Sequence, residues 1–102
     1  MNHPAFGSEA QPVFSALADS TRCALLERLR DGESSASRLA KPLGISRQAV
    51  AKHLHVLAEA GLVRHWREGR ETVFEIRLQG LAPAEAYLKS LRAAGDKVPA
   101  TG

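Results

Sequence analysis

The sequence contains little cysteine, few aromatic residues and no long apolar stretch. Cys23 is the only cysteine among 102 residues, which excludes a disulfide within the chain and is typical of a reducing compartment. The longest stretch without Asp, Glu, Lys or Arg, residues 10–18, has nine residues, whereas a membrane-spanning helix needs about 20. No basic segment followed by an apolar run marks a signal peptide. We therefore expect a cytoplasmic protein that makes no membrane contact.

Recognisable catalytic motifs are also missing. The sequence has no glycine-rich phosphate loop, no nucleophile motif and no carboxylate pair in a known context, and its four histidines are scattered. We therefore expect no enzyme activity and predict no catalytic residues.

One small domain is expected, at residues 10–93. Residues 1–9 and 94–102 lack helical periodicity and contain Pro and Gly, so we predict flexible tails at both ends. The chain between them is short, and a domain of this size buries only a modest core. Burial of apolar surface against a second copy would add stability.

Positive charge is concentrated in the middle of the chain. Residues 38–70 hold seven basic and two acidic residues, a net charge of +5, while the rest of the chain carries −2. This distribution has two interpretations, a surface that faces a polyanion or an ordinary solvated surface, and charge alone does not choose between them.

Hydrophobic periodicity predicts a mainly α-helical fold with a small β-hairpin, in the α+β class. Asp19, Ser35 and Ser46 are the predicted N-caps, because their side chains can accept backbone N–H groups. Pro12 suits a first helical turn, and Pro42 should end or distort the third helix near residue 41. Helices are expected at residues 11–17, 20–30, 36–41, 47–60 and from residue 83 onward, and strands at residues 62–67 and 72–78.

A turn at residues 68–71 should join the two strands into a hairpin. An even-numbered loop places apolar side chains on one face and opposite charges on the other, whereas an odd-numbered loop would mix the faces. The predicted cross-strand pairs are Val63 with Ile76, Arg64 with Glu75, and His65 with Phe74.

The order α-α-α-α-β-β-α indicates a winged helix-turn-helix. Two helices meet at a turn containing Gly44, and the second helix is apolar on one side only, as a helix that enters the DNA major groove should be. The basic hairpin that follows forms the wing. We predict double-stranded DNA as the partner, contacted by Ser46, Arg47, Gln48, Ala51, Lys52, His55, Arg67 and Arg70.

These predicted contacts have distinct chemical roles. Gln48 can pair with adenine, and Arg47 with guanine or a phosphate. Ser46 caps the helix and reaches a phosphate, while small Ala51 lets the helix approach the bases. Phosphate or base contacts are expected for Lys52 and His55 on the helix, and phosphate or minor-groove contacts for the two wing arginines.

The chain resembles the ArsR/SmtB family of bacterial winged-helix repressors over residues 13–92. The resemblance is carried by LADSTR (residues 17–22), SRQAVAKHL (46–54), AGLV (60–63) and the wing tip REGR (67–70). It implies a homodimer built from the first and last helices, and repression by blocking an inverted-repeat operator, often that of the protein's own operon. The implied interface residues are Val13, Phe14, Leu17, Ala84, Tyr87, Leu88 and Leu91.

The resemblance does not extend to the metal sensors of that family. Residues 33–37 have no thiol where some members carry a Cys-x-Cys site, and residues 83–92 offer only Glu85 where others bind zinc. A zinc site needs three or four ligands. We therefore predict no metal site and no cofactor, and no residue pattern identifies an inducer.

Three residues outside the predicted interface have other expected environments. His53 should be a buried, hydrogen-bonded histidine, Cys23 a half-buried small residue, and Trp66 has no predicted role. The alternative to DNA binding is a protein-interaction module, since winged helices also serve as docking units. A docking surface would show an exposed apolar patch in place of the basic face.

Overall fold

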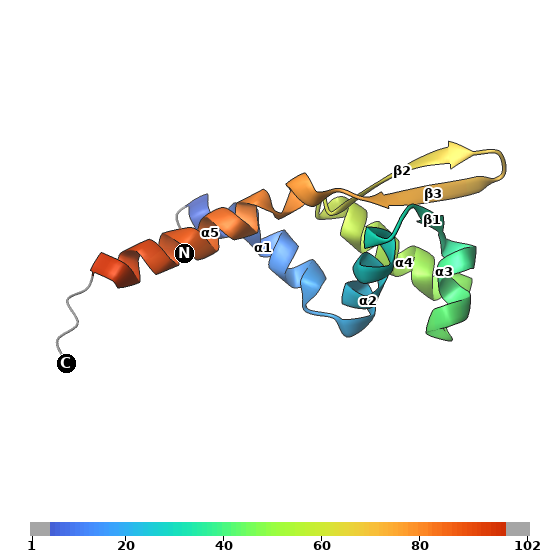
Figure 1. Ribbon diagram of the computed structural model, residues 1–102, viewed down its shortest axis with the longest axis horizontal. Helices are drawn as coiled ribbons and strands as arrows, with labels where there is room; N and C mark the ends of the chain where they lie inside the picture. Colours follow the sequence, from blue (N-terminus) through green and yellow to red (C-terminus); the bar gives the residue numbers. More distant parts are fainter. Residues whose placement is uncertain (1–4, 98–102) are drawn as a thin grey trace.

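The computed structural model describes residues 5–97 and, within them, the side chains of residues 8–95. The helices and strands follow one another in the order α1 (Ala5–Leu17), α2 (Ser20–Arg30), β1 (Ser34–Ser35), α3 (Ala36–Leu43), α4 (Arg47–Glu59), β2 (Val63–Glu68), β3 (Glu71–Ile76), a 3₁₀ helix η1 (Leu78–Leu81) and α5 (Ala82–Lys97) (Figure 1). This is the mainly α-helical winged helix-turn-helix that the sequence predicts. Within the described segments, no helix is long and apolar enough to cross a membrane.

The molecule has a body and an arm. Figure 1 shows α2, α3 and α4 packed together beside the sheet, while α1 and α5 lie side by side and project away from it. The extents are 58 × 26 × 25 Å and the radius of gyration is 16.8 Å, compared with about 13 Å for a compact chain of this length. The arm therefore extends beyond the body, and the rest of the same chain does not cover it completely.

The inner face of α4 is the centre of the core. Val50, Leu54 and Leu57 recur at helical spacing and are all 0% exposed, packed with Leu25 and Leu29 of α2. Burial of each such side chain contributes about 1.5–3 kcal/mol to the free energy of unfolding. The predicted apolar stripes of α2 and α4 are thus confirmed.

The three predicted N-caps are confirmed. The Asp19 carboxylate accepts the backbone N–H groups of Thr21 and Arg22, Ser35 Oγ accepts that of Arg38, and Ser46 Oγ accepts that of Ala49. At the other end of α4, Gly61 adopts a positive φ of 79°. The Leu62 N–H then donates to the Leu57 carbonyl at 2.9 Å, which ends the helix and turns the chain into β2.

The hairpin register is also confirmed. Val63 pairs with Ile76, Arg64 with Glu75 and His65 with Phe74, and Gly69 in the turn has a φ of 65°. The sequence did not predict the third strand: β1 pairs antiparallel with β3, so the sheet order is β1-β3-β2. A two-residue strand is too short to show periodicity.

The predicted ends of the helices are wrong in several places. Helix α1 begins at Ala5 and places Pro12 in its interior, because the packing of Ala10, Val13 and Ala16, each at most 2% exposed, outweighs the local signals. Helix α3 continues through Pro42, which lies in the last turn, where only one carbonyl loses its helical donor.

The predicted tails need a similar correction. Residues 5–9 and 94–97 are helical, in α1 and α5 respectively. The remainder of the predicted tails, residues 1–4 and 98–102, lies outside the described residues. Helix α5 begins at Ala82, after a 3₁₀ turn, so Pro83 lies in its first turn, as predicted.

The junction between α4 and α5 is built from backbone in close contact. The Arg77 N–H donates to the Leu62 carbonyl at 2.8 Å, and the Arg77 guanidinium donates to the Gly61 carbonyl. Gly80 lies directly against Gly61, since a Cβ at residue 80 would come within 2.0 Å of the Gly61 oxygen. Only glycine at this position allows the approach, which anchors the start of α5 on the end of α4.

Substitution Gly80→Ala should therefore destabilise the protein. We expect a loss of about 3 kcal/mol in the free energy of unfolding, measured by urea denaturation, because two backbone segments would have to separate. Gly95→Ala is the matched control, since residue 95 is exposed within α5 and has open space around it. It should raise stability by about 0.5–1 kcal/mol. Equal effects of the two substitutions would contradict the close contact.

Candidate nucleic-acid interface

The outer face of α4 is polar and exposed. Gln48, Lys52, His55 and Glu59 lie there, opposite the buried leucines, as the helical spacing predicts. His55 Nε2 lies 3.4 Å from a Glu59 carboxylate oxygen, one turn along the helix. The helix presents this surface to solvent because its other side is held completely in the core.

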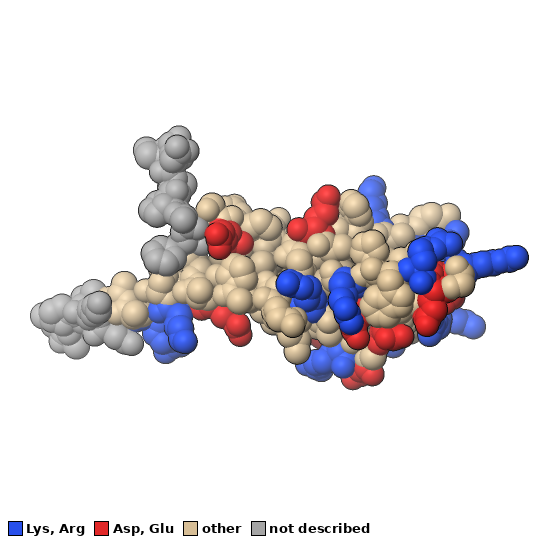
Figure 2. Space-filling model, turned by 90° about the horizontal axis from the view of Figure 1, so that it is seen from above, with Lys and Arg blue, Asp and Glu red and all other residues tan. Residues whose placement is uncertain are grey.

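Basic side chains gather at the end of the molecule that carries the wing. Figure 2 shows Lys and Arg concentrated around this end, with acidic side chains between them, away from the arm. Arg67 near the end of β2 and Arg70 in the turn are exposed. The hairpin thus extends two cations beyond the body of the protein.

A cleft of about 580 Å³ separates α4 from the wing and brings most of the predicted DNA contacts together. Six of the eight line it, namely Arg47, Gln48, Ala51, His55, Arg67 and Arg70. Ser46 and Lys52 do not line the cleft, but both are exposed beside it at the start and on the outer face of α4. A negatively charged part of a partner could lie in this cleft, between α4 and the wing.

The cleft includes residues that sequence reasoning missed. Its other lining residues come from the start of α3, from α4 and from the hairpin: Ser35, Ala36, Ser37, Ala58, His65, Trp66, Glu71, Thr72 and Phe74. Ser35 carried a signal, since it precedes a predicted helix start, where exposed N–H groups favour anions. The hairpin residues carried none, because the twist that turns them toward α4 is not visible in a sequence pattern.

Two acidic residues of β3 pair with basic residues of the wing region. Arg38 Nη2 lies 3.1 Å from a Glu71 carboxylate oxygen, and the Arg64 guanidinium pairs with Glu75 while covering the Trp66 ring at 5.3 Å. Exposed pairs of this kind contribute about 0–1 kcal/mol each, so their main effect is to offset the charges of Arg38 of α3 and Arg64 of β2. Trp66, which had no predicted role, is half-buried and forms part of this cluster.

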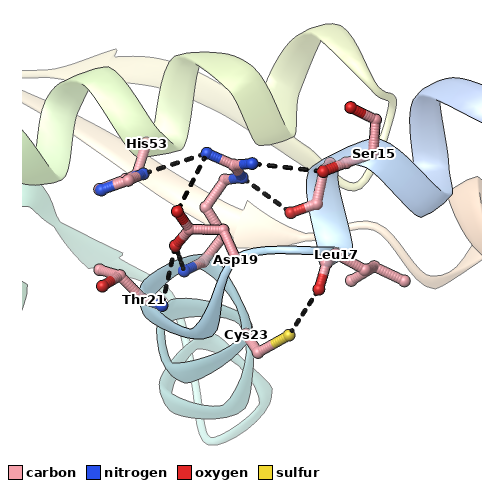
Figure 3. A network of polar contacts seen from close by, with 8 residues as sticks. Ser15, Leu17, Asp19, Thr21, Cys23 and His53 are labelled. Carbon is pink, nitrogen blue, oxygen red and sulfur yellow. Dashed lines mark hydrogen bonds and ion pairs between the residues drawn. The ribbon is translucent and has the colours of Figure 1, made fainter.

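A polar network links α1, α2 and α4 on the other side of the body (Figure 3). The Arg22 guanidinium donates to the Ala16 carbonyl at 2.7 Å and the Ser15 carbonyl at 3.2 Å, and Nη1 lies 3.3 Å from His53 Nδ1. His53 is thus half-buried and hydrogen-bonded. The pKa of Asp19 lies below its ordinary value, because its carboxylate accepts the Arg22 backbone N–H and lies beside the Arg22 guanidinium.

The cysteine lies close to this network. Cys23 is half-buried, as predicted, and its thiol donates to the Leu17 carbonyl with an Sγ–O distance of 3.2 Å (Figure 3). Within the described part of the chain, no three His, Cys, Asp or Glu side chains are grouped as ligands of a metal ion would be.

The predicted dimer residues fall into three classes of exposure. Val13 and Ala84 are at most 5% exposed within one chain, so they support the arm from inside and offer little surface to a second copy. Phe14 and Tyr87 are half-buried with their rings 5.9 Å apart, edge to face. Leu88 and Leu91 are 54% and 53% exposed, while Leu17 is half-buried.

Comparison with known sequences gives consistent matches. A model described as a helix-turn-helix domain matches residues 17–65. The chain is 44% identical over 70 residues to the HTH-type transcriptional regulator Rv2034 of Mycobacterium tuberculosis, covering 69% of this chain and 65% of that protein. It is 40% identical over 81 residues to the regulator CmtR of the same species, covering 79% and 69%. The chain therefore spans about two thirds of the length of these relatives.

A transcriptional repressor from Bacillus subtilis, SdpR, is also similar. It is 26% identical to this chain over 84 residues, which cover 82% of this chain and 93% of the repressor.

Solved structures with the same fold include ArsR-type regulators. One ArsR family transcriptional regulator superposes with a TM-score of 0.83 at 30% identity, over 97% of this chain and 100% of its own. An ArsR-like regulator from Rhodococcus sp. RHA1 has a TM-score of 0.78 at 39% identity, over 88% and 85%. A homodimeric winged helix-turn-helix domain from Mycobacterium bovis, at 22% identity and a TM-score of 0.67, covers 100% and 96% and shares the fold.

The capping carboxylate should make the fold sensitive to acid. A carboxyl group whose pKa is lowered by folding stabilises the protein above its ordinary pKa, about 3.8, and that contribution is lost as the pH falls through the lowered value. Asp19→Asn should therefore be less stable than the natural chain at pH 7, and the difference should shrink toward pH 3. Urea denaturation at both pH values measures it, and a difference that grows in acid would contradict the assignment.

Proposed function

Because the chain belongs to the ArsR family of winged helix-turn-helix transcriptional regulators, we propose that it is a repressor that binds an inverted-repeat operator as a homodimer. The observation that carries the proposal is the cleft between α4 and the wing, where six predicted DNA contacts meet on one exposed surface. Binding at its own promoter, in the cytoplasm, would make the repressor autoregulatory.

In this proposal α4 lies in the major groove. Its first turn carries Ser46, Arg47 and Gln48, which meet the edges of the bases and the adjoining phosphates, and Ala51 leaves room for close approach. Lys52 and His55 follow along the same exposed face. The wing arginines then contact the backbone or minor groove beside the site, so that one DNA strand passes through the cleft.

The arm would join two copies. Leu88 and Leu91 lie more than half exposed on α5, and an arm of two helices that projects from the body has apolar surface left to bury. A two-fold axis through this arm places one α4 on each side. Two such helices read half-sites about 34–36 Å apart when they enter successive major grooves. Residues 10–93 contain both the DNA-contacting face and the arm.

The alternative of a protein-docking module finds little support at the cleft. Among the described residues, the exposed large hydrophobic side chains are Leu78, Leu88 and Leu91, and none of them lines the cleft. Trp66 and Phe74 also line the cleft, but both are half-buried. A docking surface of comparable size would instead show large exposed apolar side chains there.

Substitutions on the exposed face should separate positioning contacts from base contacts. Lys52→Ala and Arg70→Ala should weaken binding to all duplexes and reduce the slope of log K against log salt concentration by about 0.9 each, the value for one phosphate contact. Gln48→Ala should relax the preference for one base pair, at a cost of about 1–3 kcal/mol in binding free energy. Gel shifts on the DNA upstream of the protein's own gene, at several salt concentrations, measure both effects.

Arg28→Ala is the matched control, because it removes the same charge from an exposed position on α2 outside the cleft. It should leave the affinity and the salt slope nearly unchanged. Unchanged DNA affinity in all three variants, Lys52→Ala, Arg70→Ala and Gln48→Ala, would defeat the proposed interface.

A charge on the arm should separate the two copies. Leu88→Glu should raise the dimer dissociation constant about 100-fold, since each copy loses roughly 1.5 kcal/mol of apolar burial. Sedimentation equilibrium measures the change. The control is Leu78→Glu, which alters an exposed leucine in η1 rather than on the arm, and it should leave the dimer intact. A dimer that tolerates the first substitution and not the second would place the interface elsewhere.

A further inference from the structure

The Arg22 side chain contacts both the arm and α4. Its guanidinium donates to the carbonyls of Ser15 and Ala16 at the end of α1 and lies 3.3 Å from the His53 ring in the middle of α4. The Arg22 side chain belongs to α2, so a single planar group joins three helices. Figure 3 shows the His53 ring pointing into this network from α4.

The chemistry of the pair defines its geometry. A guanidinium can only donate hydrogen bonds, so His53 Nδ1 must accept, and the neutral ring then carries its proton on Nε2. The Asp19 carboxylate lies 3.7 Å from Arg22 Nη1 and also caps α2, which holds the guanidinium in place. The Arg22 side chain is only 17% exposed, so water competes weakly for these contacts.

This contact and the glycine junction hold α4 at two separate points. Gly80 fixes the end of α4 against the start of α5, as described above. Burial of Val50 and Leu54 sets which face of α4 is exposed. The contact at His53, which adjoins Lys52 of that exposed face, adds a directional constraint in the middle of the helix.

We infer that Arg22 is a positioning residue for DNA recognition: it sets the orientation of α4 relative to the α1–α5 arm through His53, without touching DNA. The inference rests on the proposed function, because the orientation of α4 on the arm determines where each recognition helix of a dimer meets its half-site. Substitution of Arg22 should therefore lower the affinity for the specific operator and change the affinity for random duplex DNA little.

Arg22→Lys tests the inference, because lysine keeps the charge but lacks the planar fork that spans the α1 carbonyls and His53 together. Affinity for the DNA upstream of the protein's own gene should fall about tenfold, the value of one charged hydrogen bond, with an unchanged salt slope. Affinity for a random 30-base-pair duplex should stay within about twofold. Arg28→Lys, the same change at an exposed position of α2, is the matched control and should alter neither.

A double-mutant cycle separates positioning from general destabilisation. His53→Leu removes the acceptor and should lower the specific affinity as Arg22→Lys does, while the double variant should be no worse than either single variant. His53→Asn places an amide oxygen near the position of Nδ1 and should restore part of the affinity. Circular dichroism melts confirm that each variant is folded at the assay temperature. Additive losses, or equal losses on specific and random DNA, would overturn the inference.

A measurement without DNA tests the contact itself. In the ¹⁵N spectrum of the imidazole groups at pH 8, the His53 Nδ1 signal should move in Arg22→Lys and stay in place in Arg28→Lys. An unmoved signal overturns the contact, whatever the DNA results. If the signal moves but the natural chain binds no duplex DNA, the proposed function fails and the contact is then only structural.

Discussion

The structure depends on the burial of one side of α4. Val50, Leu54 and Leu57 have no exposed surface, so the helix cannot turn without taking leucine side chains into water, at about 1.5–3 kcal/mol each. The face on the opposite side is exposed as a geometric consequence of that burial. The caps at Ser46 and Gly61 give the helix defined ends, and the direction in which Gln48 and His55 point follows from the core beneath them.

Helices α1, α4 and α5 share one apolar core, and two chemically different junctions add to it in relating α4 to the arm. One is a backbone contact between Gly61 and Gly80, where the two chain segments lie too close for a side chain to fit between them. The other is the polar contact of Arg22 with His53, which depends on direction because each hydrogen bond requires an aligned donor and acceptor. A steric junction fixes distance and a polar junction fixes orientation, so the two constrain α4 in different ways.

The local parts of this design could be predicted from the sequence, and the long-range parts could not. Caps at Asp19, Ser35 and Ser46 have a signal within three residues, and the hairpin register follows from alternation and charge pairing. Helix α1 packs along α5, which lies at the other end of the sequence, so no local pattern gives its extent. The partners Arg22 and His53 lie 31 residues apart, and no spacing rule relates positions on two different helices.

The difference between local and long-range signals also changes how the basic charge of residues 38–70 should be interpreted. A charge count over residues 38–70 treats all seven cations as available to bind a polyanion. Arg38, however, is paired with Glu71, and Arg64 with Glu75. These two glutamates follow the stretch in the sequence but lie beside it in space. Within the described chain, the basic side chains of this stretch that form no ion pair are Lys41, Arg47, Lys52, Arg67 and Arg70. Four of these five were predicted to contact DNA. The charges of the paired arginines are offset by neighbouring carboxylates, and the unpaired ones keep the positive charge that a phosphate backbone attracts. Whether an arginine of this stretch is paired or free is therefore set by the position of β3, which places a carboxylate beside some arginines and leaves the others facing solvent.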